Sequence, residues 1–222
     1  MAYFLTFEGL DGSGKSTHLQ RAADWLRARG EAVDVTREPG GTGLGDAIRG
    51  VFLDPETGSI DGRVEALMVF ASRRQHLVQR IEPALASGTH VLCDRFTDSS
   101  MAYQGHGREL GTDWVERLDR LATDGRRPDR TLLFDLPPEI AQGRGQKKDR
   151  SKGPPDRLDV EGLAFYEKVR GAFLELAAAE PERFVIIDSS GEADATWRQV
   201  ETVLCDLFPG AAAQGAAQGA RA

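Results

Sequence analysis

Residues 9–17 of the chain read Gly-Leu-Asp-Gly-Ser-Gly-Lys-Ser-Thr and fit the phosphate-binding pattern G-x-x-x-x-G-K-S/T at every fixed position. The glycines allow the backbone to turn with its N–H groups pointing inward, so that a di- or triphosphate can bind at a helix N-terminus. Lys15 is then expected to reach the β- and γ-phosphates, and Ser16 to ligate Mg²⁺. The residues predicted to bind the nucleotide are Gly9, Leu10, Asp11, Gly12, Ser13, Gly14, Lys15, Ser16 and Thr17.

The segments on either side are those that this motif requires, which disfavours a glycine-rich turn that binds nothing. A strand is predicted over residues 3–7, and a helix whose apolar residues share one face follows the loop. This alternation of strands and helices predicts a three-layer α/β P-loop NTPase fold with a five-stranded parallel sheet flanked by helices. The other predicted strands are 32–36, 90–93, 131–136 and 184–188, and the other predicted helices are 43–53, 64–85, 113–123, 160–179 and 195–208.

Polar residues follow two of these strands at the sheet edge where ligands bind in open α/β folds. Residues 37–42 read Arg-Glu-Pro-Gly-Gly-Thr, and Asp94-Arg95 end the strand 90–93. A carboxylate at the end of a hydrophobic strand can lie near Mg²⁺ and its waters, so Asp94 joins Ser16 as a candidate metal ligand. Arg95 would supply a forked donor for a phosphate. The alternatives are a surface turn and a structural ion pair.

Three further segments carry polar residues in an unusual density. Arg73 and Arg74 are adjacent in the predicted helix 64–85, and helical spacing leaves open which of them faces a cleft. Residues 96–107 are too polar for a simple core helix, and their hydroxyl and amide groups could read the edge of a base. Residues 142–158 are basic and glycine-rich, as a solvated loop or a nucleic-acid arm would be. In a phosphate-binding enzyme they predict a lid that excludes water and brings an arginine onto the transferred phosphoryl group.

Composition limits the remaining possibilities. The 222 residues fit one domain, predicted over residues 1–208, and a low-complexity tail at 209–222 is expected to be disordered. The net charge of -7 argues against a general affinity for nucleic acid or a membrane. Cys93 and Cys205 stand in apolar runs, which favours buried free thiols. A cytoplasmic location is expected, because no signal-peptide pattern precedes the first strand and no apolar run approaches about 20 residues.

The ordered combination of these motifs resembles thymidylate kinase of the bacterial type over nearly all of residues 3–208. The resemblance implies the transfer of the γ-phosphoryl group of ATP to dTMP, giving ADP and dTDP, as a step of dTTP synthesis. It also implies Mg²⁺ as the cofactor, ATP and dTMP as the small-molecule partners, and a homodimer formed through the helices near residues 64–85. The matching stretches are residues 7–17, 37–42, 73–76, 94–100, 102–105 and 156–159.

The resemblance further implies where dTMP binds. Arg73 and Arg95 resemble the pair that holds the dTMP phosphate, and Glu38 and Pro39 line the same cleft. Ser100 and Gln104 fall where the family hydrogen-bonds thymine. Tyr103 falls where the family packs against the deoxyribose and disfavours a 2′-hydroxyl. Val69 stands where the family often carries an aromatic ring that stacks on thymine, so the neighbouring Phe70 is the candidate for that contact.

The catalytic residues implied by the resemblance are Lys15, Asp11, Arg95 and a lid arginine. Asp11 is implied to lie beside the sugar of the nucleotide and the metal. Because Gly12 follows this acid, the lid is implied to supply the catalytic arginine. Arg144 matches that position best, with Arg150 and Arg157 as alternatives.

Other functions compete with this one. A nucleoside monophosphate kinase for UMP, CMP or AMP would share the loop, the sheet and a lid, but Tyr103-Gln104 after Asp94-Arg95 favours dTMP. A regulatory or partitioning ATPase would need an activated water, whereas this chain offers a basic cleft for a second phosphate. A nucleotide-binding protein without catalysis is disfavoured by the complete phosphate loop and the lid arginines. Phosphoryl transfer needs two anionic nucleotides held in line and the charge on the moving group neutralised.

Overall fold

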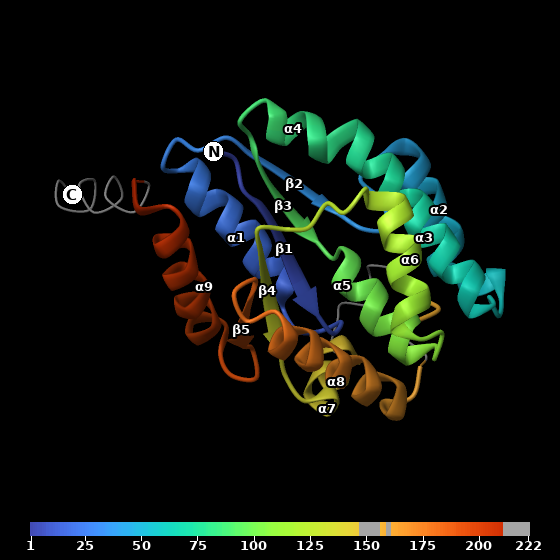
Figure 1. Cartoon of the computed structure of the whole chain (residues 1–222). Coiled ribbons are helices and arrows are strands. Elements are labelled where there is room, and N and C mark those ends of the chain that lie inside the picture. The colour runs from blue at the N-terminus through green and yellow to red at the C-terminus, as the bar shows by residue number, and fades with distance from the viewer. Residues whose placement is uncertain (147–155, 159–160, 211–222) are drawn as a thin grey trace.

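Parallel strands form the central sheet, in the order β2-β3-β1-β4-β5. The computed structural model describes residues 1–146, 156–158 and 161–210 (Figure 1). Since β1 lies between β3 and β4, the segments that follow β1 and β3 meet at one edge of the sheet. The predicted α/β fold with a five-stranded parallel sheet is confirmed. The strands are β1 (Phe4–Gly9), β2 (Val33–Arg37), β3 (His90–Asp94), β4 (Arg130–Asp135) and β5 (Phe184–Asp188).

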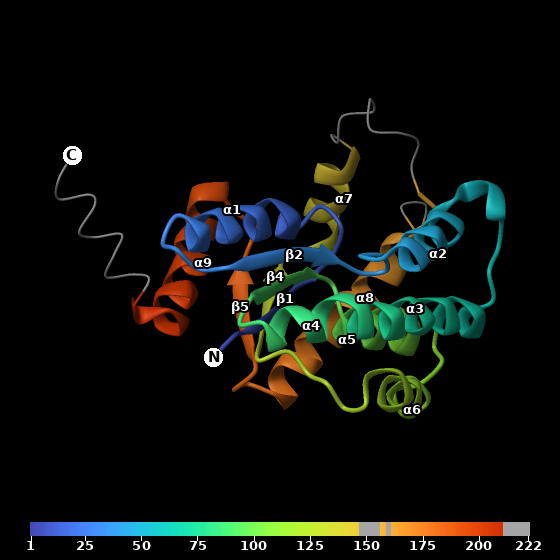
Figure 2. The ribbon, with the colours of Figure 1, turned by 90° about the horizontal axis from the view of Figure 1, so that it is seen from above.

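Helices cover both faces of the sheet (Figure 2). On one face lie α1 (Lys15–Arg27) and α9 (Ala193–Leu207), and on the other α4 (Glu82–Ala86), α5 (Thr97–Ser100) and α8 (Leu163–Ala179). Every residue of β1 is buried, as expected for a central parallel strand with both faces covered. The remaining helices are α2 (Gly43–Leu53), α3 (Gly62–His76), α6 (Thr112–Thr123) and α7 (Pro138–Gln146), with a short 3₁₀ turn at Pro55–Thr57.

The predicted helix 64–85 is formed by α3, a π-helical turn (Leu77–Ile81) and α4. Its apolar pattern divides between two faces. Phe70 and Ile81 are buried, whereas Val64, Leu67 and Val78 are about half exposed. A row of apolar side chains therefore remains on the outside of this helix.

The polar segment 96–107 is almost wholly buried and helical, but it is no simple core helix, because several of its residues line the cleft described below. It consists of α5 and a π-helical turn, η3 (Met101–Gly107). Burial is tolerated because the polar groups find partners inside the protein. Thr97 Oγ1 donates to Asp119 at 2.7 Å, and Ser99 Oγ donates to Glu8 at 2.5 Å.

The helix α7 was not predicted, although Pro138 at its first position is a common helix start.

Both cysteines are free thiols; Cys93 is buried as predicted, and Cys205 is partly exposed. None of the helices in the described part of the chain combines the length and the apolar composition needed to cross a membrane. Most of the predicted lid, including Arg150, and the tail from residue 211 onward lie outside the described residues.

Candidate active site

The phosphate loop, residues 9–17, joins the end of β1 to the start of α1. Its turn depends on glycine for two reasons. Gly9 and Gly12 have φ values of 134° and 84°, a region that side-chain-bearing residues rarely adopt. A Cβ atom at Gly9 would also lie 2.4 Å from the carbonyl oxygen of Phe134, and one at Gly12 would lie 2.3 Å from that of Ala141. The loop thus packs directly against β4 and α7.

Asp11 brings two cations together at the mouth of the phosphate loop. Its Oδ1 atom lies 3.3 Å from Lys15 Nζ and 3.0 Å from Arg95 Nη2. Lys15 is buried and also donates to the Leu10 carbonyl. Arg95, at the end of β3, has a φ of 70° and donates to Ser99 Oγ at 2.9 Å. The loop lysine and the strand-end arginine therefore flank the same carboxylate.

A hydroxyl and a carboxylate meet beside the loop. Ser16 Oγ donates to Asp94 Oδ2. The other carboxylate oxygen, Asp94 Oδ1, is buried and has no hydrogen-bond partner within the described part of the chain. Oxygen ligands of this kind suit a hard divalent cation that completes its shell with phosphate oxygens and water. The two residues predicted as metal ligands are thus adjacent, and they fit such a cation.

A cleft opens beside the loop at the carboxyl edge of the sheet. It contains seven of the eight residues predicted to bind dTMP, and the exception is Phe70. Arg73 faces this cleft, whereas Arg74 pairs with Asp124 at the surface. The cleft is lined by Asp11, Glu38, Pro39, Arg49, Phe52, Leu53, Val69, Arg73, Arg95, Phe96, Ser99, Ser100, Tyr103, Gln104, Asp156 and Leu158.

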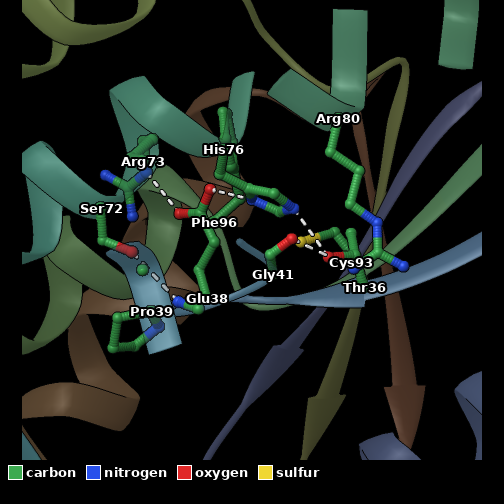
Figure 3. A network of polar contacts seen from close by, with 12 residues as sticks. Thr36, Glu38, Pro39, Gly41, Ser72, Arg73, His76, Arg80, Cys93 and Phe96 are labelled. Carbon is green, nitrogen blue, oxygen red and sulfur yellow. Dashed lines mark hydrogen bonds and ion pairs between the residues drawn. The ribbon is translucent and has the colours of Figure 1, made fainter. Parts of the chain in front are cut away.

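A buried charge network adjoins the cleft through Glu38 and Arg73 (Figure 3). Glu38 lies between Arg73 and His76, accepting from Arg73 Nε at 2.6 Å and pairing with His76 Nδ1 at 2.9 Å. The other ring nitrogen, His76 Nε2, lies 2.7 Å from Thr36 Oγ1. This network joins β2, the turn after it and α3, and it holds the guanidinium of Arg73 in place.

Arg73 lines the cleft, and its guanidinium is only partly hydrogen-bonded among the described residues. It lies over the rings of Phe70 and Phe96, at 4.6 and 5.0 Å from their centroids. Arg73 Nη2 donates to Ser100 Oγ at 3.0 Å, while Nη1 is buried without a hydrogen-bond partner among the described residues.

Phe70 does not occupy the position predicted for it. It lies in a core cluster with Ala66, Met101 and Val115, where its ring contacts the Arg73 guanidinium. Val69 lines the cleft instead. Successive helical residues point about 100° apart, so Phe70 and Val69 cannot share one face of α3.

Arg49 is a cleft residue that the sequence analysis missed. It projects from α2 and donates to the Pro39 carbonyl at 3.2 Å. Its pKa is lowered by burial and then by the positive charges of Arg37 and Arg95. Arg49, Arg73 and Arg95 line the cleft alongside three acidic residues, and their forked guanidiniums are suited to bind an anion. The signal was a basic residue on the helix that directly follows the turn 37–42.

Glu8 is a second residue that was missed as a site residue. It is fully buried in β1 and accepts from the backbone N–H of Phe96 at 2.7 Å and of Ser99 at 3.3 Å. Burial, followed by the charge of Asp98, raises its pKa to about 7. Glu8 holds the turn from which Arg95 projects, because Ser99 Oγ bonds to both Glu8 and Arg95.

The two lid arginines that the structure describes are engaged elsewhere. Arg144, on α7, donates to the carbonyl oxygens of Ser189, Ser190 and Gly191 at 2.7, 3.0 and 3.0 Å. Arg157 pairs with Glu65 at 2.5 Å. Neither arginine lines the cleft. The catalytic role of Arg144 stays a prediction.

The fold and the site together define a P-loop phosphotransferase, in which a phosphate loop and an arginine-lined cleft share one sheet edge. A sequence model of the thymidylate kinase family matches residues 7–200. The thymidylate kinase of Desulfosudis oleivorans is 47% identical over 193 residues, covering 86% of this chain and 90% of the relative. That of Geobacter sulfurreducens is 44% identical over 211 residues, covering 94% and 99%. That of Neisseria gonorrhoeae is 45% identical over 206 residues, covering 92% and 97%. This chain belongs to the thymidylate kinase family, and the resemblance seen in its motifs is confirmed.

Proposed function

We propose that this chain transfers the γ-phosphoryl group of ATP to dTMP in the cleft described above, giving ADP and dTDP. The reaction is that of the family to which the chain belongs. One observation carries its assignment to these residues. Lys15 of the phosphate loop and Arg95 of the cleft both contact Oδ1 of Asp11, so two phosphate groups bound by them would be neighbours.

The donor nucleotide is assigned to the phosphate loop, residues Gly9 to Thr17. Inward N–H groups and Lys15 would bind the phosphates, where the helix dipole also favours negative charge. We infer that the divalent metal is Mg²⁺, with Ser16 and Asp94 holding it directly or through water; when bound, it neutralises charge on the phosphates. Asp11 keeps Lys15 and Arg95 at fixed positions, which supports its predicted catalytic role.

The acceptor phosphate is assigned to Arg95 and Arg49. Both guanidiniums line the cleft, and Arg95 adjoins the phosphate loop through Asp11. Forked guanidiniums bind phosphate oxygens in pairs and spread the charge of the transferred group. A strong general base is unnecessary, because the attacking oxygen already belongs to an anion.

The nucleoside is assigned to the opposite end of the cleft. Arg73 was predicted to hold the phosphate with Arg95, but its contact with Ser100 supports a role at the base. Its unpaired Nη1 would donate to a carbonyl oxygen of thymine. Gln104 also lines the cleft. The Arg95 guanidinium lies over the ring of Tyr103, 4.9 Å from the ring centroid. This arrangement supports the predicted packing of Tyr103 against the deoxyribose.

A lid arginine is proposed to complete the charge neutralisation. For Arg144 this would require exchange of three carbonyl contacts for a phosphate. Arg150 and Arg157 remain the alternatives, although Arg157 is paired with the buried Glu65.

We also propose a homodimer formed through α2 and α3. Leu44 and Val51 of α2 and Val64 and Leu67 of α3 are each about half exposed, and the two helices pack side by side. Burying such residues against a second copy would remove apolar surface from water. Sedimentation of the full chain and of Leu67→Asp tests this, since the variant should be monomeric. The cytoplasmic location stays a prediction.

A coupled ADP-release assay tests the proposed reaction. ATP and a divalent metal are supplied with dTMP, dUMP, UMP, CMP or AMP as the acceptor. We expect turnover to be largely confined to dTMP, with dUMP weaker. Turnover with UMP, CMP or AMP instead would refute the assignments of Ser100, Tyr103 and Gln104. Hydrolysis of ATP at the same rate without an acceptor would refute the kinase reaction.

A further inference from the structure

Glu65 is a fully buried carboxylate on α3 that has no part in the proposed chemistry. Three side chains donate to it. Arg157 Nη1 lies 2.5 Å from Oε1, while Arg108 Nε and Gln104 Nε2 lie 3.1 and 3.4 Å from Oε2. Two guanidiniums therefore neutralise the carboxylate, and among these three donors, Gln104 is the contact that leads from it to the cleft lining.

The contact with Glu65 determines how the amide of Gln104 is turned. An ionised carboxylate accepts hydrogen bonds and cannot donate them. If the amide were reversed, its oxygen would face a carboxylate oxygen with no proton between them. One N–H of the amide is thus engaged by Glu65, and this orientation leaves the amide oxygen as the acceptor that Gln104 can present to a ligand in the cleft.

We propose that Glu65 is a positioning residue that makes Gln104 an acceptor toward the base, and thereby favours thymine or uracil over cytosine. The proposal rests on the proposed function, in which the base of the acceptor lies beside Gln104. The N3–H group of thymine can donate a hydrogen bond to the amide oxygen. N3 of cytosine carries none, so two acceptors would face one another. A site whose buried polar groups remain unpaired rejects the wrong ligand strongly.

Arg73 acts in the same sense at the adjacent position. Its Nη1, which has no partner in the described part of the chain, would supply a donor that suits the carbonyl at C4 of thymine and not the amino group of cytosine. Glu65 does not contact Arg73 through any hydrogen bond of the structure, so the two contributions can be separated by substitution.

The test compares the dissociation constants of dTMP and dCMP, measured by calorimetry on the full chain. In Glu65→Gln the new amide can donate or accept, so Gln104 is free to turn. We expect the preference for dTMP over dCMP to fall about tenfold, the effect of one hydrogen bond. The KM for dTMP should rise while kcat is retained. In a Gln104→Leu background, Glu65→Gln should leave the preference unchanged, because Glu65 acts through Gln104.

Two further variants separate positioning from stability. Arg108→Gln breaks the ion pairs of Arg108 with Glu65 and Glu161 but leaves Gln104 in place, so stability should fall without a change in preference. Glu65→Asp keeps the charge for both arginines and shortens the side chain, and the longest contact, that with Gln104, should be lost first. If Glu65→Gln fails to fold, Glu65→Asp decides.

An unchanged preference in the folded Glu65 variants would overturn the proposal, as would an equal fall in the Gln104→Leu background. Failure of the proposed function is read separately, from the wild-type chain. In that case the unmodified protein would not phosphorylate dTMP, whatever the variants showed.

Discussion

Two neighbouring arginines on α3 form ion pairs of equal length in opposite surroundings, which allows a controlled test of burial. Arg73 pairs with Glu38 at 2.6 Å, and both side chains are 1% exposed. Arg74 pairs with Asp124 at 2.6 Å, with exposures of 49% and 74%. The substitutions compared are Glu38→Gln and Asp124→Asn, each of which removes one negative charge and preserves the side-chain shape.

The two substitutions should differ in cost because water can replace only one of the lost partners. Glu38→Gln leaves the Arg73 guanidinium buried without its counter-charge and disturbs the contact with His76 as well. Breaking a buried pair in this way costs about 3 to 5 kcal/mol. Asp124→Asn exposes Arg74 to solvent and should cost at most about 1 kcal/mol. Asp124 has a φ of 52°, which asparagine tolerates, so no backbone strain is added.

Urea unfolding at equilibrium measures both free energies of unfolding, with the midpoint and the slope fitted for each variant. Wild type and the two variants are compared in one buffer without nucleotide. The expected result is a loss of about 3 kcal/mol or more for Glu38→Gln and a far smaller loss for Asp124→Asn. Equal losses of unfolding free energy in the two variants would show that Glu38 does not stabilise the buried charge of Arg73, and would refute the reasoning.

Three other outcomes are expected. Arg49→Gln should raise the KM for dTMP about tenfold or more and leave that for ATP unchanged, because a charged hydrogen bond to phosphate is lost; Arg37→Gln, at an exposed ion pair, is the control. Glu8→Gln should remove a pH dependence of stability. Burial raises the pKa of Glu8 from 4.5 to about 7, so the folded protein favours the protonated carboxyl. The resulting stabilisation is complete below pH 4.5 and is lost as the pH rises through 7. That contribution is about 3 kcal/mol, seen as a smaller difference between urea unfolding at pH 5 and pH 8 in the variant. Gly12→Ala should abolish ATP binding by calorimetry, since its Cβ would meet a backbone oxygen of α7 at 2.3 Å, whereas Gly125→Ala, equally strained but open, should only lower stability.

Each of these three predictions can be contradicted by a specific result. A KM for dTMP that rises equally in Arg49→Gln and Arg37→Gln would indicate a general effect of charge. An identical pH dependence in wild type and Glu8→Gln would contradict the raised pKa. Retained ATP affinity in Gly12→Ala would show that the phosphate loop can move away from α7.

Much of the fold and of the phosphate site could be predicted from the sequence, because their signals are local. The phosphate loop is a contiguous run of residues with fixed spacing, so its chemistry follows from residue types alone. The predicted strands and helices were found at their places, because apolar periodicity reflects which faces are buried, whereas the more polar α5 and α7 were not predicted. The motifs also identified the family, and the match of the family model to residues 7–200 confirmed it.

The directions of side chains within those elements could not be predicted in the same way. The sequence did not show that Arg73 faces the cleft and Arg74 the solvent, or that Val69 and not Phe70 lines it. Such directions depend on how α3 is turned against α6 and the segment 97–107, and helical spacing leaves that rotation open.

Only the tertiary structure decided which polar groups share a partner. Glu8 holds a turn 88 and 91 positions away, and Glu65 meets Gln104 across 39 positions and Arg157 across 92. A buried polar group must find a hydrogen-bond partner, but the partner is set by the packing of distant elements. The sequence by itself determined that this chain binds nucleotide phosphates and belongs with the thymidylate kinases. Packing decided which arginines, carboxylates and amides form the cleft, because burial makes their contacts both obligatory and long-range.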